Sequence, residues 1–222
     1  MRQQRPRRRD PDRKTRILEA SAELIAARGY NSVSLADIGA QAGIVGSGIY
    51  RHFPSKSAIL VELLTQVMDR LEAAATGIAA EFSDDREALT ALVRHHVRVA
   101  VHDRYVLQVY HGEVQNLAED NRRKLRRAQR HYIEEWVAVV GPLRGDLTDS
   151  EVRLTVHAAI GAIQSILFHN LGVPTDRLVE LLDQAAHACL GVPPAPGVPL
   201  WPLERPAAEQ TDDSELSDSL IT

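Results

Sequence analysis

Apolar residues recur every three to four positions along most of the chain, which is the spacing of amphipathic helices. Long stripes of this kind cover residues 13–28, 56–80, 84–100, 118–140, 149–169 and 176–190. Three shorter segments, 34–41, 46–52 and 104–115, carry weaker versions of the same pattern. No segment alternates apolar and polar residues convincingly, as a half-buried strand would. The pattern predicts an all-α fold of about nine helices.

Cap and stop residues bound these segments. Ser34 with Asp37, and Thr148 three residues before an acid, match the capping-box pattern that starts a helix. Glycines suited to a helix C-terminus follow at 29, 43 and 191, and the pair Gly141-Pro142 is expected to end the long helix before it. Segments 34–41 and 46–52 are therefore two short helices joined by a glycine turn, which is typical of a helix-turn-helix.

Cysteine usage and hydropathy exclude several classes of protein. The single cysteine, Cys189, excludes an internal disulfide framework and a multi-cysteine zinc site. No run of about 18 apolar residues is present, so no membrane span or membrane partner is expected. The basic N-terminus is not followed by an apolar stretch of signal-peptide type, so we expect a cytoplasmic protein.

Charge is distributed unevenly along the chain. The net charge is −4, which by itself argues against a nucleic-acid partner. Residues 1–56, however, hold eleven Lys and Arg against five Asp and Glu, whereas residues 192–222 hold six acids and one Arg. A local cationic patch decides polyanion binding more than the total charge does, so the N-terminal part is a candidate DNA-binding region.

Residues 15–64 resemble the DNA-binding domain of the TetR family of transcriptional regulators. The matching stretch reads TRILEASAELIAARGYNSVSLADIGAQAGIVGSGIYRHFPSKSAILVELL. The signals in it are Ala20–Leu24, Gly29-Tyr30, Ser34–Ile38, Ala42–Ile44, Ile49-Tyr50, His52-Phe53 and Ser55-Lys56. The resemblance implies a dimeric transcriptional repressor that binds a palindromic double-stranded operator and is released by a small hydrophobic effector. It also implies a helical C-terminal domain that binds the effector and dimerises.

The predicted DNA contacts are Ser34, Val45, Gly46, Ser47, Gly48, Tyr50, Arg51, His52 and Lys56. Residues 45–48 begin the recognition helix, where short side chains can enter the major groove. The family more often has a basic or polar residue and Thr among these positions. Gly46 and Gly48 each lower the stability of the recognition helix by roughly 1 kcal/mol relative to alanine. Arg51 is placed to reach a guanine edge or a phosphate, and the resemblance makes Tyr50, His52 and Lys56 phosphate contacts. The alternative for Tyr50 and His52 is simple packing within the small domain.

The chain divides into four predicted parts. Residues 1–12 form a disordered basic arm, which either enters a minor groove or adds only weak attraction to phosphates. Residues 13–56 form the helix-turn-helix domain, and residues 57–191 form the ligand-binding and dimerisation domain. Residues 192–222 form a disordered, acidic, proline-rich tail.

The last two predicted helices have broad apolar faces with small residues in the middle, and the resemblance implies that they pair with their copies in a homodimer. The middle helices are expected to enclose the effector. The candidate ligand contacts are His96, Leu107, Tyr110, His111, Arg123, Arg127, Tyr132, Trp136, Gln164 and Phe168. For each of them, ordinary core packing is the competing interpretation.

A basic run, residues 122–130, has two interpretations. It is either a solvated helix face with acidic partners, or a mouth that holds the phosphates of an acyl-CoA thioester whose acyl part lies near Tyr132 and Trp136. The histidines contain no i, i+4 pair and no accompanying acidic cluster, so no metal site is predicted. No cofactor is expected either.

Two other classes of function were weighed. An all-α enzyme would need a nucleophile motif, a metal-binding helix motif or a phosphate loop, and none is found. The chain is therefore not expected to be an enzyme. A DNA-binding architectural protein or activator that needs no ligand is the other alternative.

Overall fold

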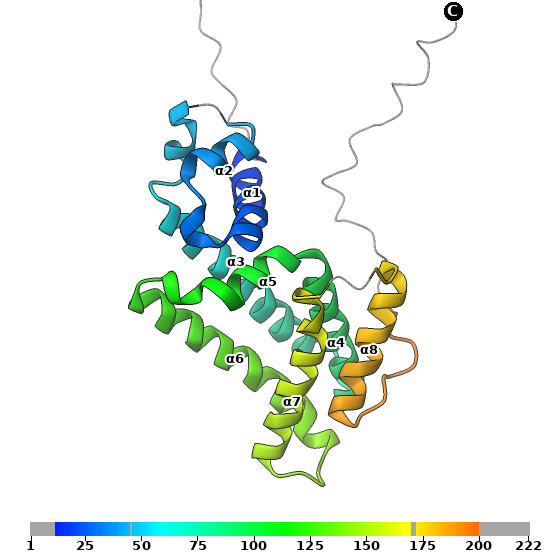
Figure 1. Cartoon of the computed structure of the whole chain (residues 1–222). Coiled ribbons are helices and arrows are strands. Elements are labelled where there is room, and N and C mark those ends of the chain that lie inside the picture. The colour runs from blue at the N-terminus through cyan, green and yellow to red at the C-terminus, as the bar shows by residue number, and fades with distance from the viewer. Residues whose placement is uncertain (1–11, 45, 170–171, 200–222) are drawn as a thin grey trace, which may run out of the picture.

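The computed structural model describes residues 12–44, 46–169 and 172–199, and in this part of the chain it contains eight α-helices, four short 3-10 helices and no strand. Figure 1 shows a small head of helices at one end and a larger helical body below it. The all-α prediction is confirmed. Within residues 12–199, outside the gaps, no helix combines the length and apolarity needed to cross a bilayer.

The head is built from α1 (Asp12–Arg28), the 3-10 turn η1 (Tyr30–Ser32), α2 (Leu35–Gln41) and the 3-10 helix η2 (Gly46–Arg51). The predicted capping box starts α2, because the Ser34 hydroxyl accepts from the Asp37 amide while the Asp37 carboxylate accepts from the Ser34 amide. The chain reverses after α1 at Gly29, where φ is +78°, and after α2 at Gly43, where φ is +66°. These turns pack Ile17, Ile38, Ile49 and Phe53 into one small core.

The predicted third helix, 46–52, is a 3-10 helix and not an α-helix. Two of its six residues are glycines, which lower helix propensity, and Pro54 prevents it from extending. Gly48 has a further role, because a Cβ atom placed there would lie 2.8 Å from Cγ2 of Ile44. The side chain of Ile44 thus occupies the space that a larger residue at 48 would need.

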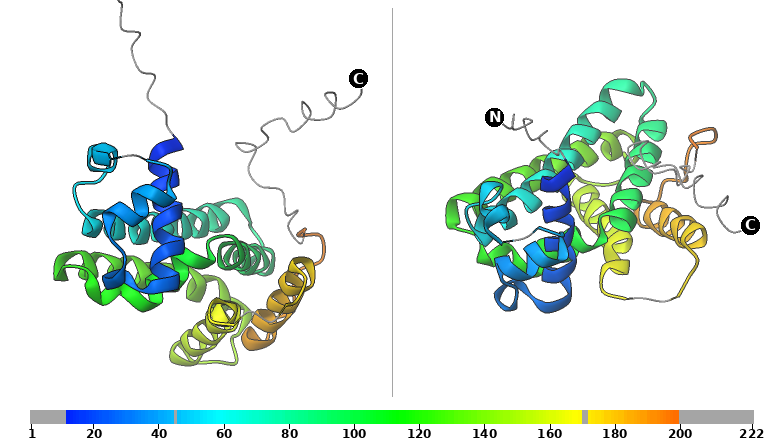
Figure 2. Two further views of the ribbon diagram at one scale, coloured as in Figure 1. Left: turned by 45° about the horizontal axis from the view of Figure 1, so that its top comes forward. Right: turned by 90° about the horizontal axis from the view of Figure 1, so that it is seen from above.

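The body consists of α3 (Lys56–Glu81), α4 (Asp85–His102), α5 (Arg104–Glu113), η3 (Val114–Asn116), α6 (Glu119–Leu143), α7 (Asp149–Gln164), η4 (Ser165–Leu167) and α8 (Thr175–Leu190). Helix α3 begins beside the head and continues into the body, where it packs on α4 and α6. Its apolar stripe from Ile59 to Leu71 is buried, as its spacing predicts. Figure 2 shows α7 and α8 side by side at one edge of the body.

Two predicted helix ends were wrong. Helix α6 continues through Gly141-Pro142 to Leu143, because the proline ring already has a helical φ and the Arg144 amide still reaches the Val140 carbonyl at 3.1 Å. Helix α7 was expected to run to His169 but ends at Gln164 and tightens into η4. Side chains of α5 bind the carbonyls beyond that point: Gln108 donates to the Leu167 carbonyl and Arg104 to the His169 carbonyl.

The first part of the predicted disordered tail is ordered. Residues 192–199 fold back on α4, where Arg86 donates to the Pro193 and Pro194 carbonyls and Thr90 Oγ1 accepts from the Ala195 amide at 2.9 Å. Val192 and Ala195 are each only 6% exposed. The composition of this segment suggested disorder, but α4 supplies polar partners that no local pattern reveals. Residues 200–222, like the basic arm 1–11, lie outside the described residues.

Candidate nucleic-acid interface and ligand site

One edge of the head presents polar and aromatic side chains to solvent. Ile49 and Phe53 anchor η2 in the core with 2% and 3% exposure, whereas Tyr50 between them is 59% exposed. Arg51 and His52 are exposed beside it. The alternative in which Tyr50 and His52 pack inside the small domain therefore does not describe this structure. An exposed aromatic ring beside a guanidinium group and an imidazole ring suits contact with a phosphate backbone.

The predicted base-reading positions are described only in part. Val45 lies outside the described residues, and for Gly46 and Ser47 only the backbone is described. Gly48 is half-buried against Ile44. The contacts of these four positions with bases therefore stay a prediction.

Ser34 lies at the N-terminus of α2, as predicted, but its hydroxyl is already in use. It accepts from the Asp37 amide at 3.1 Å and donates to the Asp37 carboxylate at 2.5 Å. The two bonds that the carboxylate accepts, from the Ser34 hydroxyl and from the Ser34 amide, lower the pKa of Asp37, because they stabilise its charged form. Ser34 thus orients the start of α2, and a phosphate would meet backbone amides there more readily than this hydroxyl.

Lys56, the first residue of α3, is also occupied within the head. Its Nζ donates to the carbonyls of Tyr30 and Val33 at 2.5 and 2.6 Å, and it lies 4.2 Å from the centroid of the Tyr30 ring. Only the third N–H of the ammonium group is left for another partner. The structure therefore gives Lys56 a role in holding the head together, in addition to any role at a phosphate.

Six of the predicted ligand contacts meet in the body. His96 on α4 bonds to the Tyr132 hydroxyl through Nδ1 at 2.8 Å and to the Gln164 amide through Nε2 at 3.2 Å. The other end of Gln164 lies 3.0 Å from Nε2 of His111. Two further aromatic rings contact this hydrogen-bonded series: Trp136 packs edge-on against His96, and Phe168 packs edge-on against His111. Helices α4, α5, α6 and α7 with η4 all contribute to it.

Burial favours the neutral forms of His96 and Tyr132 in this cluster. His96 is 1% exposed, and burial lowers its pKa to about 3. Burial likewise raises the pKa of Tyr132. One tautomer satisfies the chain: Gln164 donates to a neutral His96, which donates through Nδ1 to Tyr132. Leu107 is buried and Tyr110 half-buried beside it. His96, Tyr132 and Trp136 pack inside the body as ordinary core residues do, whereas His111 and Phe168 are exposed.

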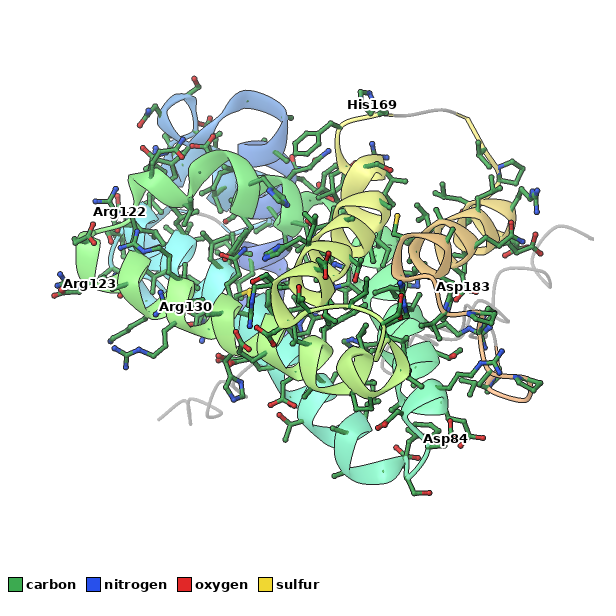
Figure 3. All side chains as sticks on the ribbon, turned by 90° about the horizontal axis from the view of Figure 1, so that it is seen from below. Asp84, Arg122, Arg123, Arg130, His169 and Asp183 are labelled. Carbon is green, nitrogen blue, oxygen red and sulfur yellow. The ribbon has the colours of Figure 1, made fainter. Side chains whose placement is uncertain are left out.

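Arg123 and Arg127 do not join this cluster. Arg123 precedes Tyr132 by nine residues, about two and a half helical turns, so the two side chains leave α6 on opposite faces. Arg123 is 62% exposed and paired with Asp120, and Arg122 and Arg126 both pair with Glu119. Figure 3 shows Arg122 and Arg123 near the N-terminal end of α6. Arg123 therefore does not share a site with an acyl group at Tyr132, whereas a contact of Arg127 with an effector stays a prediction.

A cavity of about 230 Å³ lies elsewhere, between residues 61–69 of α3 and the first half of α6. Its lining is Val61, Thr65, Met68, Asp69, Leu117, Asn121, Lys124, Leu125 and Ala128. The buried side chains among these are apolar, and the polar ones stand at the rim. The sequence analysis did not predict this cavity. Asn121 lies one helical turn before the inward-facing Leu125, and Lys124 lies directly before it. That spacing is a weak signal for a polar rim.

Among the described residues of the body, three of the four exposed large apolar side chains lie on α7, on α8 or directly after η4, and the fourth is Tyr105 on α5. Leu154 on α7, Phe168 just after η4 and Leu181 on α8 are 68%, 62% and 39% exposed. The small residues Ala158 and Gly161 lie on the exposed side of α7. In the described part of the chain, no three His, Cys, Asp or Glu side chains gather as metal ligands would.

Two family models match this chain. Residues 17–63 match a model described as bacterial regulatory proteins of the tetR family, and residues 83–167 match a tetracyclin repressor-like C-terminal domain. The first match covers the head and the start of α3. The second covers most of the body up to the end of η4.

Curated relatives and solved structures agree with these matches. The chain is 30% identical over 142 residues to the HTH-type transcriptional repressor KstR2 of Rhodococcus jostii, covering 61% of this chain and 70% of that protein. It is 25% identical, with a TM-score of 0.70, to the ketosteroid transcriptional regulator KstR2 of Mycobacterium tuberculosis, covering 82% and 94% of the two chains. AibR, solved with isovaleryl coenzyme A and operator DNA, has the same fold, with a TM-score of 0.65, 21% identity and coverage of 79% and 97%.

Proposed function

Because this chain belongs to the TetR family of bacterial regulatory proteins and is a DNA-binding transcriptional repressor of that family, we propose that it binds a palindromic operator as a homodimer and is released by a small effector. The proposal keeps the division into a DNA-binding domain, residues 13–56, and a ligand-binding and dimerisation domain, residues 57–191. Its relatives are regulators, so the proposed role is regulatory and not catalytic, in the cytoplasm where DNA is accessible.

The exposed edge of η2 is the single observation that carries the DNA-binding part. Tyr50, Arg51 and His52 leave the head on its solvent side while their neighbours anchor it. We assign these three side chains to the operator, with Arg51 reading a base edge or a phosphate. Gly46, Ser47 and Gly48 would let the backbone approach the groove closely, because they have short side chains or none. Ser34 and Lys56 contribute mainly by fixing the head.

The test is selection of duplexes from a random pool by the purified full chain, followed by affinity measurements on the selected sequence. Arg51→Ala is expected to weaken binding by about tenfold or more, as loss of one specific base or phosphate contact per head would. Arg177→Ala, on α8, is the matched control and is expected to leave affinity unchanged. Recovery of no preferred duplex at low salt would refute the proposal.

The exposed apolar side chains of α7 and α8 support the homodimer. Soluble monomers rarely expose several large apolar side chains on neighbouring elements, and a two-fold pairing of α7 and α8 with their copies would bury Leu154, Phe168 and Leu181. Leu154→Arg is expected to give monomers in sedimentation. Tyr105→Arg, at a position on α5 that is 51% exposed, is the matched control and is expected to leave the dimer intact. Dimers of the Leu154→Arg protein would count against this interface.

For the effector, we propose an anionic amphiphile of the acyl-CoA class, held at the cavity between α3 and α6. The apolar floor of the cavity suits an acyl group. Lys124 at the rim, and Arg127 one turn further along α6, form no ion pair with an acidic side chain among the described residues. The neighbour AibR was solved with an acyl-CoA, which supports this class. A ligand between these helices would shift α3, from which the head extends.

Calorimetry with isovaleryl-CoA and with free coenzyme A tests this assignment. Lys124→Ala is expected to weaken thioester binding severalfold. Arg123→Ala is the matched control, because its side chain faces away from the cavity. A thioester that binds both variants and the unaltered chain equally would exclude the cavity. A repressor that binds its operator equally with and without cell extract would instead support ligand-independent binding.

A further inference from the structure

The corner between α1 and α2 is held by the body from two sides. After Gly29 the backbone of Tyr30 donates its amide to Oε1 of Glu113 at 3.0 Å, across 83 residues of sequence. The carbonyl of the same residue accepts from Nζ of Lys56 at 2.5 Å. One residue of the head is thus bound by the last residue of α5 and by the first residue of α3.

Gly29 forms the turn at this corner, beside the Glu113 carboxylate. Its φ is +78°, a conformation that favours glycine, and a Cβ atom placed there would lie 3.6 Å from Oε1 of Glu113. The carboxylate therefore lies directly over the corner. A hydrogen bond from an amide to a carboxylate is charge-assisted and stronger than one between neutral groups. This bond is a specific attachment between the head and the body.

The same carboxylate is connected to the cavity. Its Oε2 accepts from Nδ2 of Asn116 at 2.6 Å, and the next residue, Leu117, is 4% exposed and forms part of the cavity wall. On the other side, Lys56 lies five residues before Val61, which lines the cavity from α3. Both attachments of the corner are thus continuous with walls of the cavity.

We infer that Glu113 is the residue that positions the DNA-binding head in response to the cavity. A molecule that displaces Leu117 shifts Asn116 and Glu113, which releases the Tyr30 amide and lets the head change its orientation on the body. The coupling arises because the bound molecule favours the state in which this bond is broken. The inference rests on the proposed function only for the identity of what the head and the cavity bind.

Amide hydrogen exchange of the full chain, followed by NMR at Tyr30, tests the attachment. Glu113→Ala is expected to accelerate exchange at Tyr30 by about ten- to a hundredfold, since a bond to a charged group is lost. Glu113→Gln retains an acceptor and is expected to keep most of the protection. The amide of the fully buried Ile163 on α7 reports global stability. If Glu113→Ala raised the amide exchange rates of Tyr30 and Ile163 equally, or raised neither rate, the inference would be overturned.

The connection to the cavity is tested with a second pair of variants. Leu117→Ala loosens the cavity wall, and Leu182→Ala removes an equally buried leucine from α8 as the matched control. Leu117→Ala is expected to speed exchange at Tyr30 relative to Ile163, and to add nothing when Glu113 is already alanine. Equal effects of the two leucine variants, or full additivity with the glutamate variant, would show that no coupling runs through Glu113.

Neither exchange experiment needs DNA or an effector, so they judge the coupling independently of the proposed function. If the chain selects no duplex, the proposed function fails while the exchange data still decide on Glu113. If a duplex is selected, Glu113→Ala is expected to change the affinity for that operator severalfold. Glu113→Gln is expected to have nearly the operator affinity of the unaltered chain. Unchanged affinity of the alanine variant would show that the bond does not position the head.

Discussion

Replacing Lys56 with methionine separates its two possible roles. Methionine keeps the length of the side chain and its contact with the Tyr30 ring but removes the charge and all three donors. The structure shows Nζ on the carbonyls of Tyr30 and Val33 and over the Tyr30 ring. If these contacts are the main role of Lys56, the substitution weakens the head even when no DNA is present.

The magnitude follows from the contacts that are lost. A hydrogen bond to a charged group contributes about 1.5–3 kcal/mol and an exposed cation–π contact about 0.5–1 kcal/mol. Lys56 is only partly buried, so water replaces part of each bond, and we expect a net loss of about 2–4 kcal/mol. For a chain of this size, that loss corresponds to a fall in Tm of roughly 5–15 °C.

Thermal unfolding followed by circular dichroism measures this change. Lys124→Met is the control, because Lys124 is exposed and, among the described residues, has no hydrogen-bond or ion-pair partner. The salt dependence of operator binding supplies the second readout. A phosphate contact by Lys56 in each head would contribute about 0.9 per contact to the slope of log K against log salt, or about 1.8 per dimer. An unchanged Tm together with a slope reduced by that amount would refute the structural role.

Three further substitutions have expected outcomes. Gly48→Ala places a Cβ atom 2.8 Å from Ile44, so we expect about 1–3 kcal/mol of destabilisation by urea unfolding and weaker operator binding; a neutral variant would show that η2 adapts freely. Burial lowers the pKa of His96 to about 3, so between pH 6.5 and 3 the unfolded chain binds a proton that the folded chain does not, and stability falls as the pH drops. Protonation of His96 in the unfolded chain lowers the free energy of unfolding by about 2 kcal/mol at pH 5. Urea titrations at pH 7 and pH 5 are expected to show a smaller loss of stability in His96→Gln than in the unaltered chain. An equal loss in both proteins would contradict the lowered pKa of His96. Arg94 and Asp183 form an ion pair at 3.1 Å with 10% and 4% exposure, so Asp183→Asn is expected to cost about 3–5 kcal/mol because it leaves a buried charge unpaired, and a change in Tm within error would exclude that role.

The helical segments could be predicted because their causes are local. The apolar stripe of α3 and the capping boxes at Ser34 and Thr148 depend on residues within a few positions of one another. The polar cluster was partly predictable for the same reason, since His96 and Gln164 lie among apolar residues on inward faces. That they bond to each other depends on how α4 packs against α7, which no local pattern contains.

The errors share one physical origin. The early end of α7 depends on Gln108, a residue of another helix, which binds the Leu167 carbonyl. The order of residues 192–199 depends on Arg86 and Thr90 of α4. Arg123 was grouped with Tyr132 as a ligand contact, whereas nine residues of helix place these two side chains on opposite faces of α6. In each case a partner distant in sequence, or the direction of a side chain, decided the outcome.

The helices, the family and the location of the DNA-binding head could be inferred without a structure, because periodicity, caps and an ordered run of motif residues are properties of short stretches of chain. Which side chains meet depends on how the helices pack. This packing placed Glu113 and Lys56 on the two sides of Tyr30, and it opened the cavity between α3 and α6 beside them. These arrangements arise from packing between segments that are far apart in sequence, and such packing is specified by the whole chain at once.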